Sequence, residues 1–290
     1  MELETNVDGA SMHPIVPHPS PQETALKPYF QNDRCTIFNS DCFSVFSQLN
    51  GIDAIITDPP YSSGGQYRAS RVQSTSSKYV QSGTLAYRPE FGNDHFDQRS
   101  WMMWTESWLR AAKAASKDEA ILCSFIDWRQ LPALTDAVQF AGWTWRGVAV
   151  WSKKYGRVMP SGFSSAAEYI VVGSNGAMPV NEEVYPPGVF ECSSPSGNAK
   201  QHIAQKPEPV MKWVLSIVPK GTTVCDPFMG SGTTLRAAMD SGCKAIGIEV
   251  QERYCEMAAK RLSQGTPFDV ASSQNDRHHR CRRKVKKRDD

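Results

Sequence analysis

The sequence lacks any apolar run of the length that a membrane span requires. None of its 290 residues lies in a stretch of roughly 20 consecutive apolar residues, the length that crosses a hydrocarbon core. The first 20 residues are acidic and rich in proline and histidine, whereas a secretory signal is basic and then apolar. These absences predict neither a membrane span nor secretion, and they favour a cytoplasmic location.

Cysteine is present without any pattern that indicates a disulfide framework or a zinc site. The eight cysteines are scattered from Cys35 to Cys281, and no two of them form a C-x-x-C pair. Such spacing is typical of free thiols in a reducing compartment. His278 and His279 lie close to Cys281, but in a charged tail, where a solvated end is the better interpretation. We therefore expect no structural disulfide and no metal.

The body of the chain has little excess charge of either sign. The whole sequence carries a formal net charge of +2. Residues 276–290 contain eight Lys and Arg against three Asp, so this tail contributes +5 and the remainder −3. A basic tail raises the affinity for phosphates through counterion release without reading sequence. A disordered, solubilising end is an equally good interpretation.

Apolar periodicity divides the chain into an N-terminal arm, one α/β domain and the basic C-terminal tail. Residues 1–30 are rich in proline and carry no periodic pattern, so they are predicted to form a disordered arm. The domain is assigned to residues 31–263, with order beginning near Arg34, and residues 264–290 form the tail. A domain of this length can bury a sizeable core.

Short apolar strands alternate with helical segments through the domain. We predict strands at residues 35–38, 53–57, 120–126, 145–151, 169–172, 222–225 and 244–248, and helices at 42–49, 207–218, 233–240 and 251–262. Trp101, Trp104 and Trp108 recur at helical spacing and are expected to face the core. This alternation is typical of a doubly wound, mostly parallel sheet that helices cover on both faces.

Several segments lack a consistent period and are predicted to be loops. Residues 62–97 are rich in Ser, Gly, Arg, Tyr and Gln. A loop of this length in a compact domain is a lid, a binding loop or a flexible insertion, and its basic and aromatic content suits a nucleic-acid contact. Residues 155–165 are predicted to form a glycine-rich loop, and residues 174–200 to be irregular.

A glycine-rich turn follows one predicted strand directly and opens a predicted helix. Its sequence is Asp226-Pro227-Phe228-Met229-Gly230-Ser231-Gly232-Thr233-Thr234. Glycine lets a ligand approach the backbone closely, and the amides of a helix N-terminus point at that ligand. Glu249 ends the next strand, where a carboxylate can accept hydrogen bonds from both hydroxyls of a ribose.

The turn is neither of the common phosphate-binding motifs. No Gly-Lys-Ser/Thr follows its glycines, and the full G-x-G-x-x-G pattern is absent. A phosphate-free nucleoside such as S-adenosylmethionine therefore fits the pattern better. Asp226 would then face the cationic ammonium group of that nucleoside through a charge-assisted hydrogen bond.

A second motif, Asp58-Pro59-Pro60-Tyr61, ends the strand predicted at residues 53–57. Proline cannot donate to a sheet ladder, so this motif lies at the carboxyl end of that strand. The exocyclic amine of adenine or cytosine is a poor nucleophile because its lone pair is delocalised into the ring. Acceptors that draw this nitrogen toward tetrahedral geometry therefore promote its attack. The Asp58 carboxylate and the Pro59 carbonyl are two such acceptors, and Tyr61 offers a face for an extruded base.

Taken together, Asp58-Pro59-Pro60-Tyr61 and the turn at residues 226–234 resemble the amino-group DNA methyltransferases of the N6-adenine and N4-cytosine superfamily. The catalytic motif precedes the cofactor turn, as in the β-type order of that family. Asp41 stands where the family places an acidic residue against the cofactor adenine. His202-Ile203-Ala204-Gln205-Lys206-Pro207 is similar to the segment near the cofactor's methionine end. The resemblance spans residues 34–262.

This resemblance implies a Rossmann-like enzyme that transfers a methyl group from S-adenosylmethionine to a flipped base in double-stranded DNA. The product would be S-adenosylhomocysteine, and no metal would be needed. The implied catalytic residues are Asp58, Pro59, Pro60 and Tyr61, and the implied cofactor-binding residues are Asp41, Lys206, Asp226, Pro227, Phe228, Gly230, Ser231, Gly232, Thr233 and Glu249. Target recognition in the family falls in variable segments, here residues 62–97 and 152–200.

The resemblance leaves several alternatives for the substrate and the biological setting. An aspartate that opens the catalytic motif favours adenine N6 in this family, with cytosine N4 as the alternative. Residues 62–101 look like phage- and prophage-borne members, which implies a bacterial host cytoplasm and a solitary enzyme or one paired with a restriction enzyme. A silent DNA-binding protein of the same fold and an RNA methyltransferase are further alternatives. Cytosine-C5 methylation lacks a candidate nucleophile, because the sequence has no Pro-Cys dipeptide.

Overall fold

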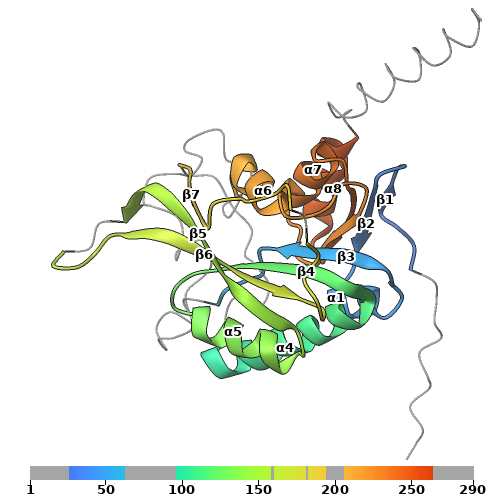
Figure 1. Ribbon diagram of the computed structural model, residues 1–290. Helices are drawn as coiled ribbons and strands as arrows, with labels where there is room; N and C mark the ends of the chain where they lie inside the picture. The colour runs from blue at the N-terminus through green and yellow to red at the C-terminus, as the bar shows by residue number, and fades with distance from the viewer. Residues whose placement is uncertain (1–25, 63–95, 158–159, 181, 194–205, 264–290) are drawn as a thin grey trace, which may run out of the picture.

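The computed structural model describes residues 26–62, 96–157, 160–180, 182–193 and 206–263, which form three layers with one sheet between two sets of helices (Figure 1). Within these residues the strands follow the order β1-β2-β9-β8-β3-β4-β6-β5-β7. Their bounds are β1 (Phe30–Gln31), β2 (Cys35–Asn39), β3 (Ile52–Thr57), β4 (Ser116–Ile126), β5 (Thr144–Arg157), β6 (Ser165–Ser174), β7 (Val189–Glu191), β8 (Thr223–Asp226) and β9 (Lys244–Glu249).

The strand pairing confirms the predicted mixed, mostly parallel sheet. The five strands from β2 to β4 pair in parallel through β9, β8 and β3. β6 is antiparallel to both β4 and β5, while β7 lies parallel to β5 and β1 antiparallel to β2. The carboxyl ends of the central parallel strands therefore meet at one edge of the sheet, where ligands bind in open α/β folds.

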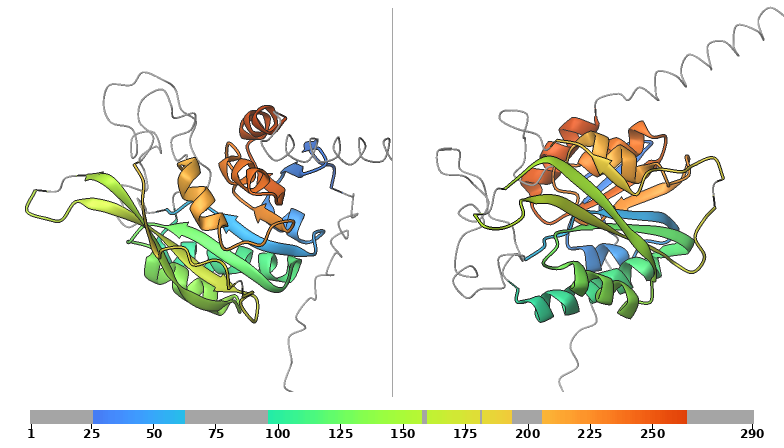
Figure 2. Two further views of the ribbon diagram at one scale, coloured as in Figure 1. Left: turned by 45° about the horizontal axis from the view of Figure 1, so that its top comes forward. Right: turned by 60° about the vertical axis from the view of Figure 1, so that its left-hand side comes forward.

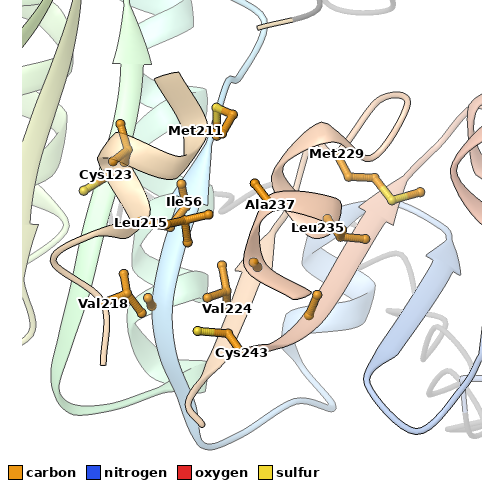
Figure 3. Close-up of a cluster of buried hydrophobic side chains, with 14 of the residues drawn as sticks. Ile56, Cys123, Met211, Leu215, Val218, Val224, Met229, Leu235, Ala237 and Cys243 are labelled. Carbon is orange, nitrogen blue, oxygen red and sulfur yellow. The ribbon is translucent and has the colours of Figure 1, made fainter. Parts of the chain in front are cut away.

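Helices cover both faces of the sheet (Figure 2). One face carries α1 (Cys42–Phe46), α4 (Gln98–Ala115) and α5 (Leu131–Phe140), and the other carries α6 (Glu208–Leu215), α7 (Thr233–Asp240) and α8 (Glu252–Leu262). Each side has its own buried cluster. Figure 3 shows part of the second, where Leu215 of α6 packs on Ile56 of β3 beside Val224 of β8. A strand buried on both faces requires the near-continuous apolar sequence that β3 and β4 have.

The tryptophan stripe confirms the predicted helix at α4. Trp101 and Trp108 are fully buried, as expected for side chains that face the core. The Trp143 indole N–H donates a hydrogen bond to the Leu109 carbonyl oxygen over 2.9 Å, which ties the connection between α5 and β5 to this helix. Asp97 caps α4 by accepting hydrogen bonds from the backbone amides of Arg99 and Ser100.

Ordered structure begins earlier than Arg34, the residue near which order was expected to start. Phe30 lies in β1, and the Tyr29 amide donates a hydrogen bond to the Ile37 carbonyl oxygen over 2.8 Å. Leu26 packs against the buried cluster below the sheet. The edge of β2 therefore recruits residues that carry no periodic pattern of their own. Residues 1–25 and the tail 264–290 lie outside the described residues.

Three elements differ from the sequence predictions. α5 was not expected, although Ala133, Leu134, Ala137 and Val138 form its buried face and its proline lies in the first turn, where proline is tolerated. β5 continues to Arg157, so the loop predicted at residues 155–165 begins only beyond that residue. β7 forms within the segment expected to be irregular, because it pairs with the exposed side of β5. No helix within the described ranges is long and apolar enough to cross a membrane.

Candidate active site

The carboxyl ends of β3 and β8 bring the two sequence motifs together. These strands are parallel neighbours, with Ile55 opposite Cys225, so Asp58 and Asp226 emerge from the same edge of the sheet. The Thr57 hydroxyl donates a hydrogen bond to Oδ1 of Asp226 over 2.7 Å. The two motifs therefore lie side by side at this edge, and the chemical roles of their residues stay predictions.

The glycine-rich turn is held open by backbone conformations that suit glycine. Gly232 has a φ angle of +77° and is the N-cap residue of α7. A Cβ atom at this position would lie 3.0 Å from Cβ of Ala258, so the close packing of α8 also favours glycine. The Gly230 amide donates a hydrogen bond to Oε2 of Glu249 over 3.1 Å. The turn and the acid at the end of β9 are therefore one structural unit.

Asp226 is a buried carboxylate that three neighbouring donors hold in place. Its Oδ1 accepts hydrogen bonds from Thr57 and from the Phe228 amide, the latter over 3.0 Å, and Thr234 also bonds to its side chain. Burial nevertheless raises the pKa of Asp226 to about 6. A cationic ligand beside this group would favour its ionised form.

The remaining predicted cofactor residues of the turn are packed against neighbouring helices. Pro227, Ser231 and Thr233 are buried, and the Arg261 guanidinium donates a hydrogen bond to the Thr233 hydroxyl over 3.2 Å. Phe228 packs against α4, with its ring centroid 5.4 Å from that of Trp104 and 5.2 Å from that of Trp108. These contacts fix the turn between α4 on one side and α8 on the other.

Asp41 and Glu249 lie at the carboxyl ends of neighbouring strands. Asn39 of β2 is opposite Glu249 of β9, and the Ser40 amide donates to the Glu249 carbonyl oxygen over 3.2 Å. Asp41 caps α1 by accepting hydrogen bonds from the Ser44 amide at 2.9 Å and the Ser44 hydroxyl at 2.6 Å. Burial raises the pKa of Glu249, whereas the bonds from Ser44 outweigh burial and lower the pKa of Asp41.

Asp58 belongs to a buried network of charges that spans four segments of the chain. Lys206 Nζ lies 2.7 Å from Oδ2 of Asp58 and 3.0 Å from Oε2 of Glu168. Lys153 pairs with the other oxygen of Glu168. The Tyr61 hydroxyl donates a hydrogen bond to Oδ1 of Asp58, and Lys206 Nζ lies 3.2 Å from that hydroxyl oxygen. Both oxygens of Asp58 are therefore engaged.

The electrostatics of this network follow from burial and from the two lysines. Burial raises the pKa of Asp58, and the Lys206 ammonium offsets this only in part. Burial acts in the same way on Glu168, but Lys206 and Lys153 together outweigh it and lower the pKa of Glu168 to about 2. Although burial opposes the charge of Lys206, its two carboxylates raise its pKa. Burial also raises the pKa of Tyr61, which therefore donates as a neutral hydroxyl.

The two prolines of the tetrad Asp58-Pro59-Pro60-Tyr61 lie next to α4, which holds them in place. Pro59 is buried, and the carbonyl oxygen of Pro60 accepts a hydrogen bond from the Trp101 indole over 2.7 Å. The ring of Tyr61 lies below Lys206, with the ammonium 5.3 Å from the ring centroid. These contacts hold the motif from two sides.

Sequence reasoning did not find Glu168, Lys153 or Thr57. The available signal was Glu168 itself, a single carboxylate between Ala167 and Tyr169 in an otherwise apolar strand. A buried charge of this kind needs a partner, but the sequence does not say which lysine supplies it. Of the predicted segment around Lys206, residues 202–205 lie outside the described residues.

A hollow of about 470 Å³ lies beside the carboxyl end of β4. Its lining residues are Trp128, Arg129, Phe163, Ser164, Ser165, Ala166, Ala167 and Tyr169. The Trp128 side chain is 59% exposed and Phe163 is fully exposed, while Arg129 pairs with Asp127 at 2.7 Å. Most of this lining falls within residues 152–200, one of the two predicted recognition segments. The other, residues 62–97, is described only at its ends.

Metal ligands do not gather in the part of the chain that the structure describes. No group of three or more His, Cys, Asp or Glu side chains there is arranged to hold a metal ion. The seven cysteines in these residues are free thiols, and Cys281 lies outside them.

Comparisons with known proteins agree with this geometry. Residues 52–260 match the N6_N4_Mtase family, described as DNA methylase, and this range contains both motifs and Glu249. The protein YubD of Escherichia coli strain K12 is 29% identical over 227 residues, which cover 77% of this chain and 88% of YubD.

Solved structures share the fold. The M1.HpyAVI–SAM complex has a TM-score of 0.58 and 22% identity, and the match covers 79% of this chain and all of that one. The PvuII DNA methyltransferase, described as cytosine-N4-specific, has a TM-score of 0.61 and 16% identity over 81% of this chain and 88% of its own. These likenesses confirm the predicted Rossmann-like methyltransferase fold. Because the family match spans most of the sequence, the chain belongs to the N6_N4_Mtase family of DNA methylases.

Proposed function

We propose that this DNA methylase transfers a methyl group from S-adenosylmethionine to the N6 amine of a flipped adenine. The observation that carries the proposal is the position of Asp58, which lies partly buried at the carboxyl end of β3, next to the strand that ends in Asp226. One strand then presents the acceptor for the amine, and its neighbour presents the turn for the cofactor.

The donors around the glycine-rich turn fit the proposed cofactor. Asp226 is a buried carboxylate with a raised pKa, which suits a site that awaits a cation such as the methionyl ammonium. Gly230 and Gly232 keep the backbone of the turn free of side chains, and Glu249 at the next strand suits the ribose hydroxyls. When bound, S-adenosylmethionine supplies an electrophilic methyl group on a sulfonium. No metal is required by this chemistry.

The residues of the tetrad would orient the amine for attack. Asp58 accepts a hydrogen bond from the exocyclic amine and stabilises the positive charge that develops on it. Asp58 then takes the proton that the methylated nitrogen loses. The carbonyl of Pro59 provides a second acceptor, and Tyr61 provides a face against which the extruded base stacks. The indole of Trp101 holds the tetrad in place through Pro60.

We propose adenine N6 rather than cytosine N4 because of the first residue of the tetrad. Aspartate at position 58 favours adenine in the resemblance on which the proposal draws. Cytosine N4 is the second candidate, because a cytosine-N4-specific methyltransferase shares the fold of this chain. The two amines differ little in chemistry, so the product nucleoside decides between them.

Double-stranded DNA is the proposed substrate, and the hollow beside β4 is the proposed contact for an unstacked base. Trp128 and Phe163 offer exposed aromatic faces, and Arg129 adds a guanidinium at the same place. Aromatic and arginine faces stack on bases without requiring a particular sequence. We also propose residues 62–97 and 152–200 as the target-recognition segments, and the basic tail as a phosphate contact.

Expression in a methylation-deficient host tests the proposal. Nucleosides from the host DNA would be separated by mass spectrometry, and modified positions would be mapped by single-molecule sequencing. The proposal expects N6-methyladenine in a defined sequence context, and none with Asp58→Ala. Soluble protein that neither binds S-adenosylmethionine nor methylates DNA would instead support the silent DNA-binding alternative. Cofactor binding without DNA methylation would make RNA the next substrate to examine.

A further inference from the structure

Each oxygen of the Asp58 carboxylate has a polar partner within the protein. Tyr61 donates to Oδ1, and Lys206 lies 2.7 Å from Oδ2. In the proposed reaction this carboxylate must accept the target amine and stabilise a growing positive charge. An ammonium that remains next to Asp58 would compete with the amine for Oδ2 and would repel the positive charge that develops on it. Lys206 therefore has to move away from Asp58.

A buried ammonium can leave one carboxylate only if another anion pairs with it. Removing one partner of a buried ion pair is costly because the other charge is left uncompensated. Lys206 has that second anion in place, since its Nζ already lies 3.0 Å from Oε2 of Glu168. Moving the ammonium fully onto Glu168 would keep it paired and would free Oδ2 of Asp58.

Glu168 itself is anchored from its own sheet. It lies opposite Trp151 in the β5–β6 ladder, and Lys153 pairs with its other oxygen. The Lys153 ammonium also lies 5.0 Å from the ring centroid of Trp151. Glu168 is therefore a fixed acceptor, whereas Lys206 is the long side chain whose ammonium can shift between two carboxylates.

We propose that Glu168 is a positioning residue, which pairs with the Lys206 ammonium so that Asp58 can accept a hydrogen bond from the target amine. This inference rests on the proposed function. Glu168 acts through Lys206 and touches neither the base nor the methyl group. Without the Glu168 charge, Asp58 would be the one anionic partner of Lys206 in the network, and Lys206 would stay paired with Asp58.

Glu168→Gln tests this role, because the substitution keeps the shape and removes the charge. We expect kcat to fall by about 10-fold to 100-fold, as for a reacting group displaced by a small distance. KM for S-adenosylmethionine and for DNA should change by less than about 3-fold, since neither binding site loses a contact. Lys153→Met is the matched control. It removes a partner of Glu168 but leaves the Glu168 charge beside Lys206, so its kcat should fall less.

The pH profile provides a readout that a loss of packing alone would not move. Asp58 faces Lys206, Glu168 and Tyr61, and it interacts with Asp226. The charge of Glu168 raises the pKa of Asp58, so its removal lowers that pKa. Because activity requires ionised Asp58, the acidic limb of kcat/KM should move to lower pH in Glu168→Gln. A purely structural defect would lower the whole profile without this movement.

A double-mutant cycle shows whether Glu168 acts through Lys206. Single-turnover rates would be compared for Glu168→Gln, Lys206→Met and the double variant, which carries no unpaired lysine at position 206. If Glu168 acts through Lys206, its substitution adds little once Lys206 is methionine. Additive losses, or a wild-type kcat with an unmoved acidic limb in Glu168→Gln, would overturn the positioning role. Methylation by the wild type and its loss in Asp58→Ala would still uphold the proposed function. A wild type that methylates no DNA would overturn both.

Discussion

Lys206 Nζ lies 2.7 Å from Oδ2 of Asp58, and the Lys206 side chain is only 9% exposed. The two residues come from the end of β3 and from the segment before α6. This pair therefore connects the central strand to the layer of helices that contains α6. Such a pair contributes little net stability when complete, but breaking it is costly. The Asp58 carboxylate is therefore part of the structural framework.

Replacing Lys206 with methionine should destabilise the protein strongly. Asp58 and Glu168 would remain buried next to each other without their shared cation, which costs about 3–5 kcal/mol of unfolding free energy. Lys212→Met is the matched control, because Lys212 forms an exposed pair with Glu208 on α6. It should cost less than about 1 kcal/mol. Urea denaturation measures both, and equal losses would contradict the network described here.

The affinity for S-adenosylmethionine should depend on pH through Asp226. Burial raises the pKa of this carboxyl to about 6. A cationic ligand needs the ionised form, so its dissociation constant should be constant above about pH 7 and rise by up to about tenfold per pH unit below about pH 6. The raised pKa of Glu249 should add to this dependence.

Asp226→Asn separates the two carboxylates. Calorimetric titrations of this variant should give weak binding with a much flatter pH dependence, since the group that binds the cation no longer ionises. A wild-type dissociation constant that is the same at about pH 5 and about pH 7.5 would contradict the assignment of Asp226 to the cationic end of the cofactor.

Gly232→Ala should damage the cofactor turn through two separable effects. The φ angle of +77° costs an alanine about 1–2 kcal/mol, and its Cβ would press on Ala258 at 3.0 Å. Gly221→Ala is the control, because Gly221 has a φ angle of +81° and open space around the added atom. Both variants should lose stability in denaturation experiments, but only Gly232→Ala should weaken binding of S-adenosylmethionine. Equal cofactor affinity in both would argue against a role for the turn.

The hollow beside β4 should contribute to DNA binding. Removing both aromatic faces with Trp128→Ala and Phe163→Ala should weaken binding of a fluorescent oligonucleotide by about tenfold or more, since base stacking contributes about 1–3 kcal/mol per base. Binding of S-adenosylmethionine should not change. Phe140→Ala is the control, because Phe140 is 63% exposed at the far end of α5 and does not line the hollow. Unchanged anisotropy titrations for the double variant would exclude the hollow as a base contact.

The local motifs and the helices next to them could be predicted from the sequence. Asp58 and Asp226 each follow an apolar run, and α7 has the predicted bounds because its first residue follows a glycine cap. In a parallel sheet, strand ends are enough to place both acids at one edge. Glu168 could not be placed in this way, because its partner Lys206 reaches it through tertiary packing.

Tertiary contacts also explain the missed elements. β7 consists of three residues that pair with β5, and β1 of two residues that pair with β2. Neither carries enough periodicity to indicate a strand alone. In α5 the buried residues recur at helical spacing, and its proline lies in the first turn, where a helix tolerates it.

The most direct test of the central claim uses purified protein, double-stranded DNA and S-adenosylmethionine with a deuterated methyl group. After digestion, mass spectrometry of the nucleosides identifies the atom that received the label. We expect labelled N6-methyladenine with the wild type, and a yield at least about 100-fold lower with Asp58→Ala at unchanged cofactor affinity. Labelled N4-methylcytosine would contradict the choice of adenine, and unlabelled DNA from a protein that binds the cofactor would contradict the claim itself.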